Sequence, residues 1–60
     1  MTDDIYKNLG YRDRTEYLRS LAEDYGVDLW IVMELASMLG PSEDFDGLVV
    51  MVQDASEMGL

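Results

Sequence analysis

The residues of this chain that could do chemistry are almost all carboxylates. The chain contains thirteen aspartates and glutamates but neither histidine nor cysteine. Without an imidazole or a thiolate there is no ordinary general base, nucleophilic sulfur or zinc site. Carboxylate pairs catalyse only in a concave, partly desolvated pocket, which three short helices do not easily enclose. The sequence therefore predicts a protein that is not an enzyme and that holds no cofactor.

The densest group of oxygen ligands directly precedes Gly47 and consists of Glu43, Asp44 and Asp46. It resembles the middle of an EF-hand calcium loop, which has carboxylates at its first, third and fifth positions and a bidentate glutamate at its last. Aligned on Gly47, Ser42 and Gln53 occupy the two terminal positions, and neither is the required ligand. Acidic capping of a helix start explains the cluster better. We predict no metal site and leave weak calcium binding near Asp44 and Asp46 open.

Charge is distributed unevenly along the chain. Residues 1–19 contain all four bases and four acids, whereas residues 20–60 contain nine acids, no base and the whole net charge of −9. Affinity for nucleic acid and for anionic membranes comes largely from lysine and arginine. We therefore expect neither as a partner, while the acidic field allows a basic protein surface.

The sequence shows no targeting or membrane segment. Asp3 and Asp4 stand where a secretory signal would have basic residues before an apolar run. The longest uncharged stretch, residues 35–42, is too short to span a bilayer. Together with the lack of cysteine, this pattern predicts a cytoplasmic protein.

Three helices, over residues 13–25, 29–39 and 43–57, are expected to form an all-α, compact three-helix bundle. In the first, the apolar side chains recur at helical spacing on one face, and these are Tyr17, Leu18, Leu21, Ala22 and Tyr25. Asp13 is the expected N-cap, with Glu16 completing a capping-box-like pair. Gly26 follows where a helix end favours a left-handed residue. Residues 1–60 are one small domain, with 1–11 as a partly ordered lead-in.

The second helix has the most unusual composition. Within residues 29–39 only Glu34 and Ser37 are polar, and a helix that is apolar nearly all round is expected to be buried nearly all round. We therefore predict that it is the central helix, with Asp28 as its N-cap and Gly40 and Pro41 ending it.

For the third helix, Ser42 is the expected N-cap. Gly47 costs about 1 kcal/mol within a helix relative to alanine, so a start near Asp46 is the alternative.

The stretch from Leu21 to Leu35 resembles a helix-turn-helix motif. Ala22 is the small residue four positions before the turn glycine Gly26, and apolar residues fill the slots at which that family packs its helices together. The resemblance implies a helix-turn-helix-like corner between the first and second helices. The family reads the major groove with polar and basic side chains, but the outward slots here hold Asp28, Trp30, Met33, Glu34 and Ser37. The charge pattern therefore argues against DNA binding.

Trp30 is the residue that the core explains least, because it projects between Glu34 and Ser37 on the polar side of its helix. Tryptophan and methionine are enriched at protein interfaces. The expected interaction residues are therefore Trp30, Met33, Glu34, Met38 and Val50. The alternative is that Trp30 packs under the N-terminal lead-in.

Three functions remain open at this point. The first is an acidic protein-interaction module or adaptor whose partner is an unknown protein, basic in charge, or a second copy in a homodimer. The second is a DNA mimic, a decoy of the anti-restriction or anti-repressor type. The third is a degenerate helix-turn-helix regulator that acts through protein contacts.

The chain is also similar to small acidic uncharacterised proteins of Gram-positive gut bacteria and their mobile elements. The similarity rests on the sequences AEDYGV, from Ala22 to Val27, and EDFDGLV, from Glu43 to Val49. It implies an accessory role in a phage or conjugative element and supplies no activity.

Overall fold

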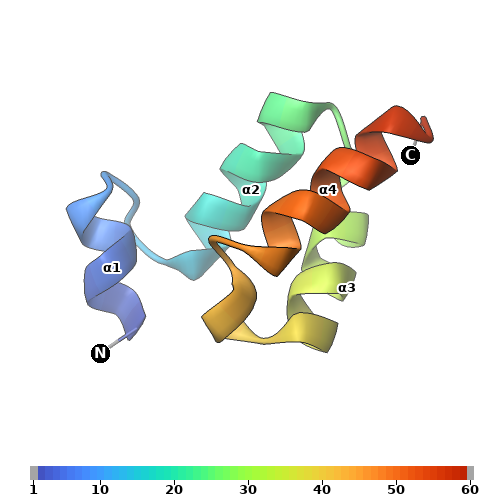
Figure 1. Ribbon diagram of the computed structural model, residues 1–60. Coiled ribbons are helices and arrows are strands. Elements are labelled where there is room, and N and C mark those ends of the chain that lie inside the picture. Colours follow the sequence, from blue (N-terminus) through green and yellow to red (C-terminus); the bar gives the residue numbers. More distant parts are fainter. Residues whose placement is uncertain (1, 60) are drawn as a thin grey trace.

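Helices account for most of the chain in the computed structural model, which describes residues 2–59. In chain order the elements are α1 (Thr2–Asn8), α2 (Arg14–Tyr25), α3 (Leu29–Leu39), the short 3-10 helix η1 (Pro41–Glu43) and α4 (Gly47–Glu57) (Figure 1). No strand occurs within this part of the chain. The predicted all-α class is confirmed.

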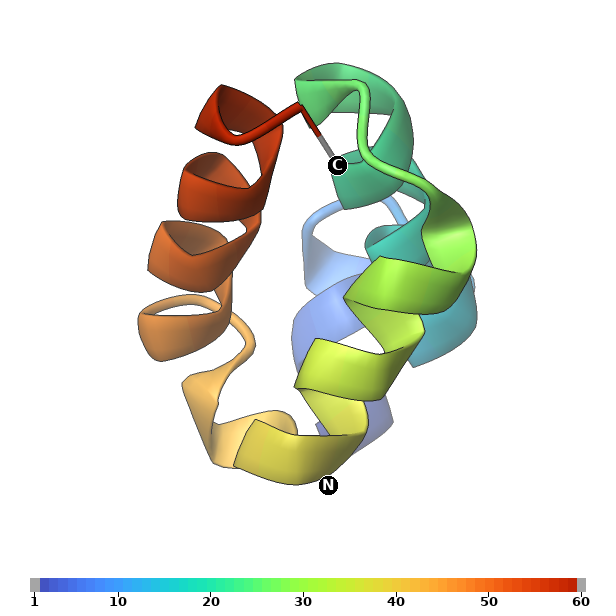
Figure 2. The same ribbon diagram turned by 90° about the vertical axis from the view of Figure 1, so that its right-hand side faces the viewer.

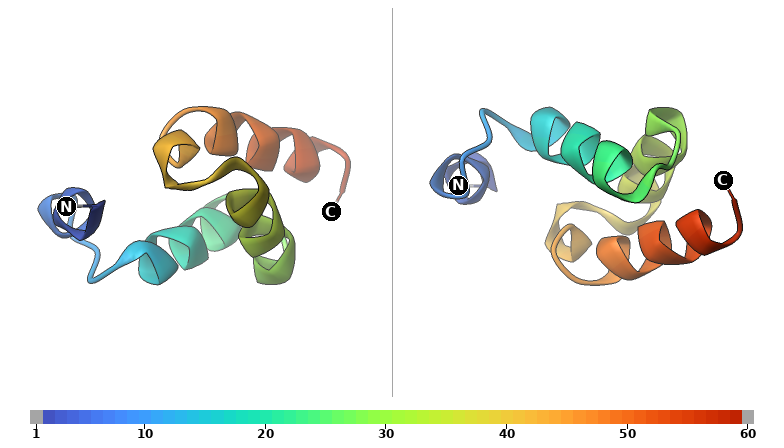
Figure 3. Two further views of the ribbon diagram at one scale, coloured as in Figure 1. Left: turned by 90° about the horizontal axis from the view of Figure 1, so that it is seen from below. Right: turned by 90° about the horizontal axis from the view of Figure 1, so that it is seen from above.

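Three of the helices form a bundle, and the fourth stands beside it. α3 and α4 run antiparallel and contact each other, and both contact α2 (Figure 2). α1 contacts α2 and lies at the end of the molecule away from α3 (Figure 3). The lead-in therefore contains a helix, a structure that the sequence had left open.

α2 begins and ends where its local capping signals predicted. Asp13 has an extended backbone, and its side chain accepts a hydrogen bond from the Glu16 N–H at 3.0 Å. Glu16 does not complete the reciprocal capping box, because its side chain accepts from the backbone N–H and Nε of Arg12 instead. At the other end Gly26 is left-handed, with φ of 67°, and its N–H donates to the Ala22 carbonyl.

α3 has the predicted bounds, but the prediction that it is the central helix is wrong. Only Val32 and Ala36 of α3 are buried. The helix that contacts all three other α-helices is α2. The physical reason is the position of α1, which packs against α2 and leaves the side of α3 opposite the core uncovered by the described residues.

The predicted start of the third helix at residue 43, with Ser42 as its N-cap, is also wrong. Residues 41–43 form η1, a turn follows, and α4 begins at Gly47, in agreement with the alternative start near Asp46. The turn is closed by backbone hydrogen bonds from Asp44 N to Pro41 O and from Asp46 N to Glu43 O. This turn lets the Asp44 side chain point into the protein.

One apolar core lies between the helices. Its buried members are Tyr6, Tyr17, Leu18, Leu21, Ala22, Val27, Val32, Ala36, Leu48, Val52 and Ala55. Most sit at spacings of three or four residues within their helix, as expected for faces turned toward a common centre. Within residues 2–59 no helix combines the length and the apolar character needed to cross a bilayer.

Candidate functional site

The outer face of α3 carries four of the five interaction residues expected from the sequence. The four residues here called the α3 face are exposed and lie at helical spacing: Trp30, Glu34 and Met38 on the side opposite the buried Val32 and Ala36, and Met33 at the edge of that side. Trp30 is 66% exposed, Met33 42% and Met38 75%. Large apolar side chains therefore project from α3 into solvent.

The alternative in which Trp30 packs under the lead-in is wrong. α1 packs beside the start of α2, whereas Trp30 belongs to the first turn of α3, next to the end of α2 (Figure 1). Asp28 and Ser37, the other two residues that the sequence predicted to face outward near the α2–α3 corner, are exposed as well. None of the five residues predicted to face outward is basic.

Val50, the fifth expected interaction residue, lies on a different helix. It is 53% exposed and stands on the side of α4 opposite the buried Leu48, Val52 and Ala55. Val50 thus belongs to the outer surface of α4 and is not part of the α3 face.

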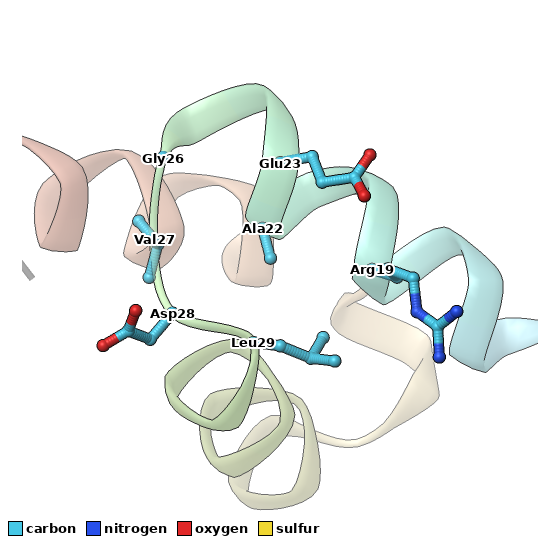
Figure 4. A pocket seen from close by; sticks show the side chains of 7 residues that line it. All are labelled: Arg19, Ala22, Glu23, Gly26, Val27, Asp28 and Leu29. Carbon is cyan, nitrogen blue, oxygen red and sulfur yellow. The ribbon is translucent and has the colours of Figure 1, made fainter.

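The shallow depression at the α2–α3 corner is a weaker candidate site. It has a volume of about 490 Å³ and is lined by Arg19, Ala22, Glu23, Gly26, Val27, Asp28 and Leu29. In Figure 4 the carboxylate of Asp28 points to the opposite side from the charged groups of Arg19 and Glu23. They do not converge on a position that a single small ligand could occupy.

A buried polar cluster centred on Asp44 is the main feature that the sequence did not predict. Asp44 is fully buried, and its two carboxylate oxygens accept from Arg14, at 2.7 Å from Nε and 2.9 Å from Nη2. The Tyr6 hydroxyl donates to the same carboxylate. The Tyr17 hydroxyl donates to the Asp44 backbone carbonyl at 2.7 Å. These four residues are called the Asp44 network below.

The Asp44 network ties together segments that are distant in the sequence. Tyr6 comes from α1, Arg14 and Tyr17 come from α2, and Asp44 comes from the turn before α4. Arg14 Nη2 also donates to the Ala36 carbonyl of α3 at 3.0 Å. Every buried side-chain nitrogen and oxygen among the described residues has a hydrogen-bond partner, which is what a stable buried ion pair requires.

Burial in this network raises the pKa of both tyrosines. The pKa of Tyr6 rises to about 12, first because burial disfavours the phenolate and then because its hydroxyl is bonded to Asp44. The pKa of Tyr17 also rises to about 12, first through burial and then through the nearby Asp44 charge. The hydrogen bond to Asp44 raises the pKa of Arg14 further above its usual value. Both phenols therefore stay protonated at neutral pH.

The hydrogen bonds of Asp44 argue against the weak calcium binding near Asp44 and Asp46 that the sequence left open. The Asp44 carboxylate points inward and is engaged by Arg14 and Tyr6, so it does not face solvent beside Glu43 and Asp46. Within the described part of the chain no three acidic residues are grouped as a metal site would require.

A sequence signal for the Asp44 network existed at Arg14. Arg14 precedes Tyr17, Leu18 and Leu21 by three, four and seven residues, so it continues the buried row of α2. A cation on a core-facing row needs a carboxylate partner. That requirement predicts a buried acid elsewhere in the chain, although it does not say which one.

Comparison with known proteins identified no similar protein. No protein-family model matches the chain, and no curated protein or solved structure matches it significantly. Inference about function therefore starts from the α3 face and the Asp44 network.

Proposed function

We propose that this protein is an acidic protein-interaction module that docks onto a basic protein partner through the α3 face. The observation that carries the proposal is the exposure of Trp30 and Met38, at 66% and 75%, on the outer side of one regular helix. Burying such side chains against a partner removes apolar surface from water, and tryptophan is among the commonest interface hot spots. A helix with apolar residues in this spacing fits a groove on another protein.

Charge favours a basic partner over a second copy of the chain. Residues 20–60 carry nine acids and no base, and Glu34 is the only charged residue of α3. A symmetric dimer through this face would bring together two chains that each carry a net charge of −9, whereas a basic protein would be attracted to the chain. The proposed partner therefore has an apolar groove with lysine or arginine at its rim.

The test is affinity capture from the source organism's lysate with four baits. These are the unchanged protein and the variants Trp30→Ala, Met38→Ala and Met58→Ala. Met58 is a matched control because it is a methionine of similar exposure, 70%, at the end of α4. We expect one protein to be captured by the unchanged chain and by Met58→Ala, and to be lost with Trp30→Ala and reduced with Met38→Ala. Equal capture by all four baits would rule out docking through the α3 face.

The oligomeric state tests the choice between a basic partner and a second copy. We expect sedimentation of a monomer across a hundredfold range of protein concentration. A dimer that dissociates on dilution and is lost in Trp30→Ala would replace the basic partner with a second copy of the chain. Substitution of Val50 by alanine shows whether the outer surface of α4 takes part.

The second candidate function, an acidic decoy that mimics DNA, is favoured by the exposure of the acids. Of the nine acids in residues 20–60, Asp44 is buried and Glu43 half-buried, while the other seven are exposed. A decoy binds mainly through charge, so its capture would survive Trp30→Ala and collapse with salt. Docking through the α3 face would depend on Trp30 at both low and high salt.

A further inference from the structure

α1 is attached to the bundle chiefly through Tyr6. α1 has seven residues, and a helix of this length is not stable by itself in water. Of residues 5–10 only Tyr6 is buried, while its apolar neighbours Ile5 and Leu9 are exposed. The docked position of α1 therefore depends on what surrounds the Tyr6 side chain.

The surroundings of Tyr6 are assembled without α1. Arg14 holds both Asp44 oxygens and also binds the Ala36 carbonyl, while Tyr17 donates to the Asp44 carbonyl. These bonds join α2, α3 and the turn before α4, so they do not require α1 to be docked. If Tyr6 leaves, a carboxylate oriented by Arg14 remains in place.

The surroundings have the shape and chemistry of a site for a phenol. The Tyr6 ring lies with its centroid 5.7 Å from that of Tyr17 and 5.6 Å from that of Phe45, in the range of favourable aromatic contacts. Its hydroxyl donates to the Asp44 carboxylate. The rings accept any flat aromatic group, while the carboxylate selects one that ends in a hydrogen-bond donor.

The connection between α1 and α2 permits α1 to move as a unit. Residues 9–13 lie between the two helices, and Gly10 has φ of 97°, a conformation that other residues rarely adopt. Backbone hydrogen bonds close this turn, from Leu9 N to Ile5 O and Tyr6 O, from Gly10 N to Lys7 O and from Tyr11 N to Tyr6 O. Rotation at Gly10 is sufficient to carry α1 away from the bundle.

We propose that Asp44, Tyr17 and Phe45 form a phenol-binding site that α1 occupies through Tyr6, and that α1 leaves this site while the three-helix bundle stays folded. The vacated site takes a tyrosine side chain presented by another polypeptide. α1 is then an intramolecular competitor for that tyrosine. This site is separate from the α3 face, so either proposal can fail without the other.

Hydrogen exchange on the full chain tests the detachment of α1. The Tyr11 N–H, bonded to Tyr6 O at 2.8 Å, reports on α1, and the Val27 N–H, bonded to Ala22 O at 3.0 Å, reports on the bundle. We expect Tyr11 to exchange about tenfold faster or more. In Tyr6→Phe the Tyr11 rate should rise further, with Val27 less affected. Equal rates at both amides in the unchanged protein would overturn the proposal, because α1 would then open only when the bundle unfolds.

The variant Tyr6→Ala, with p-cresol as probe, tests the phenol site. p-Cresol has the shape of a tyrosine side chain, and toluene is the same molecule without the hydroxyl. We expect p-cresol to raise the Tm of Tyr6→Ala and to leave that of the unchanged protein nearly constant, because Tyr6 already fills the site. Toluene should raise it less. If both compounds raise the Tm of Tyr6→Ala equally, or if neither raises it although the variant is folded, the phenol-binding site is ruled out. If the bundle does not fold in Tyr6→Ala, the proposal that α1 detaches while the bundle stays folded is ruled out.

Discussion

The Asp44 network and the α3 face are opposite in every physical respect. The first consists of polar and charged groups held away from water, with each hydrogen-bonding group satisfied. The second consists mainly of large apolar side chains that are exposed to water by 42% to 75%. A satisfied buried network stabilises the fold, and it can bind another group only after Tyr6 has left. An exposed apolar helix face contributes less to the fold and is therefore the better candidate for recognition.

The largest effect on stability is expected when the cation of the Asp44 network, Arg14, is removed. Arg14→Ala leaves the fully buried Asp44 carboxylate without its bidentate partner. We expect a loss of about 4 kcal/mol in the free energy of unfolding, enough to unfold most of so small a domain. The control is Arg12→Ala, because Arg12 pairs with Glu16 at the surface and contributes little. Circular dichroism during urea unfolding measures both, and similar small losses would show that the network is not what stabilises the fold.

Alkaline pH tests the same network without a substitution. The folded-state pKa values of Tyr6 and Tyr17 lie at about 12, above the ordinary 10.0, so the folded protein holds these protons more tightly than the unfolded chain. The resulting stability is fully present below pH 10 and is lost as the pH rises through 12. At about pH 11 we expect a loss of about 1 kcal/mol for each tyrosine. Unfolding by urea at several pH values measures it, and a flat profile would contradict the assigned burial.

A smaller effect is expected when only one hydroxyl of the network is removed. Tyr6→Phe keeps the ring and deletes the bond to Asp44, so we expect a loss of about 1.5 kcal/mol in the free energy of unfolding. Tyr25→Phe is the matched control, because the Tyr25 hydroxyl accepts from Gln53 at the exposed surface. That change should cost about 0.5 kcal/mol or less. Equal losses would mean that burial adds nothing to the Tyr6 bond.

The smallest effect on stability is expected from the α3 face. Trp30→Ala should change the free energy of unfolding by about 0.5 kcal/mol or less, because most of the side chain is in water. The fluorescence of Trp30 in the unchanged protein should be quenched readily by the neutral quencher acrylamide. A large loss of stability, or a tryptophan shielded from acrylamide, would remove the distinction between the two regions.

Signals within a few residues predicted the limits of α2 and α3. The features that the sequence did not predict depend on contacts between residues that are distant in the sequence. The limits of α2 and α3 follow from Asp13, Gly26 and Gly40, whose effects extend only a few residues. The start of α4 depends instead on Asp44, whose partner Arg14 lies thirty positions earlier. The carboxylates around Asp44 therefore looked like a helix cap or a calcium loop.

The sequence predicted correctly that Trp30 is exposed, but it predicted wrongly that α3 is the central helix of the bundle. Helical spacing puts Trp30 between Glu34 and Ser37 whatever surrounds the helix, and Trp30 is exposed. The burial of α3 as a whole depends on how many neighbours it has, and that number depends on where α1 packs. Spacing within one helix contains no information about the position of another.

Gly26, at the α2–α3 corner, is favoured there because its backbone is left-handed and not because a side chain would lack room. A Cβ atom added to Gly26 would meet no other atom within 4 Å, yet its φ of 67° is unfavourable for an L-amino acid. A D-alanine at this position, introduced by chemical synthesis, has the opposite preference, so that a φ of 67° is favourable for it. It would favour the corner in the folded protein while restricting the unfolded chain. Mirror-image chemistry thus offers a way to stiffen the junction that positions Trp30.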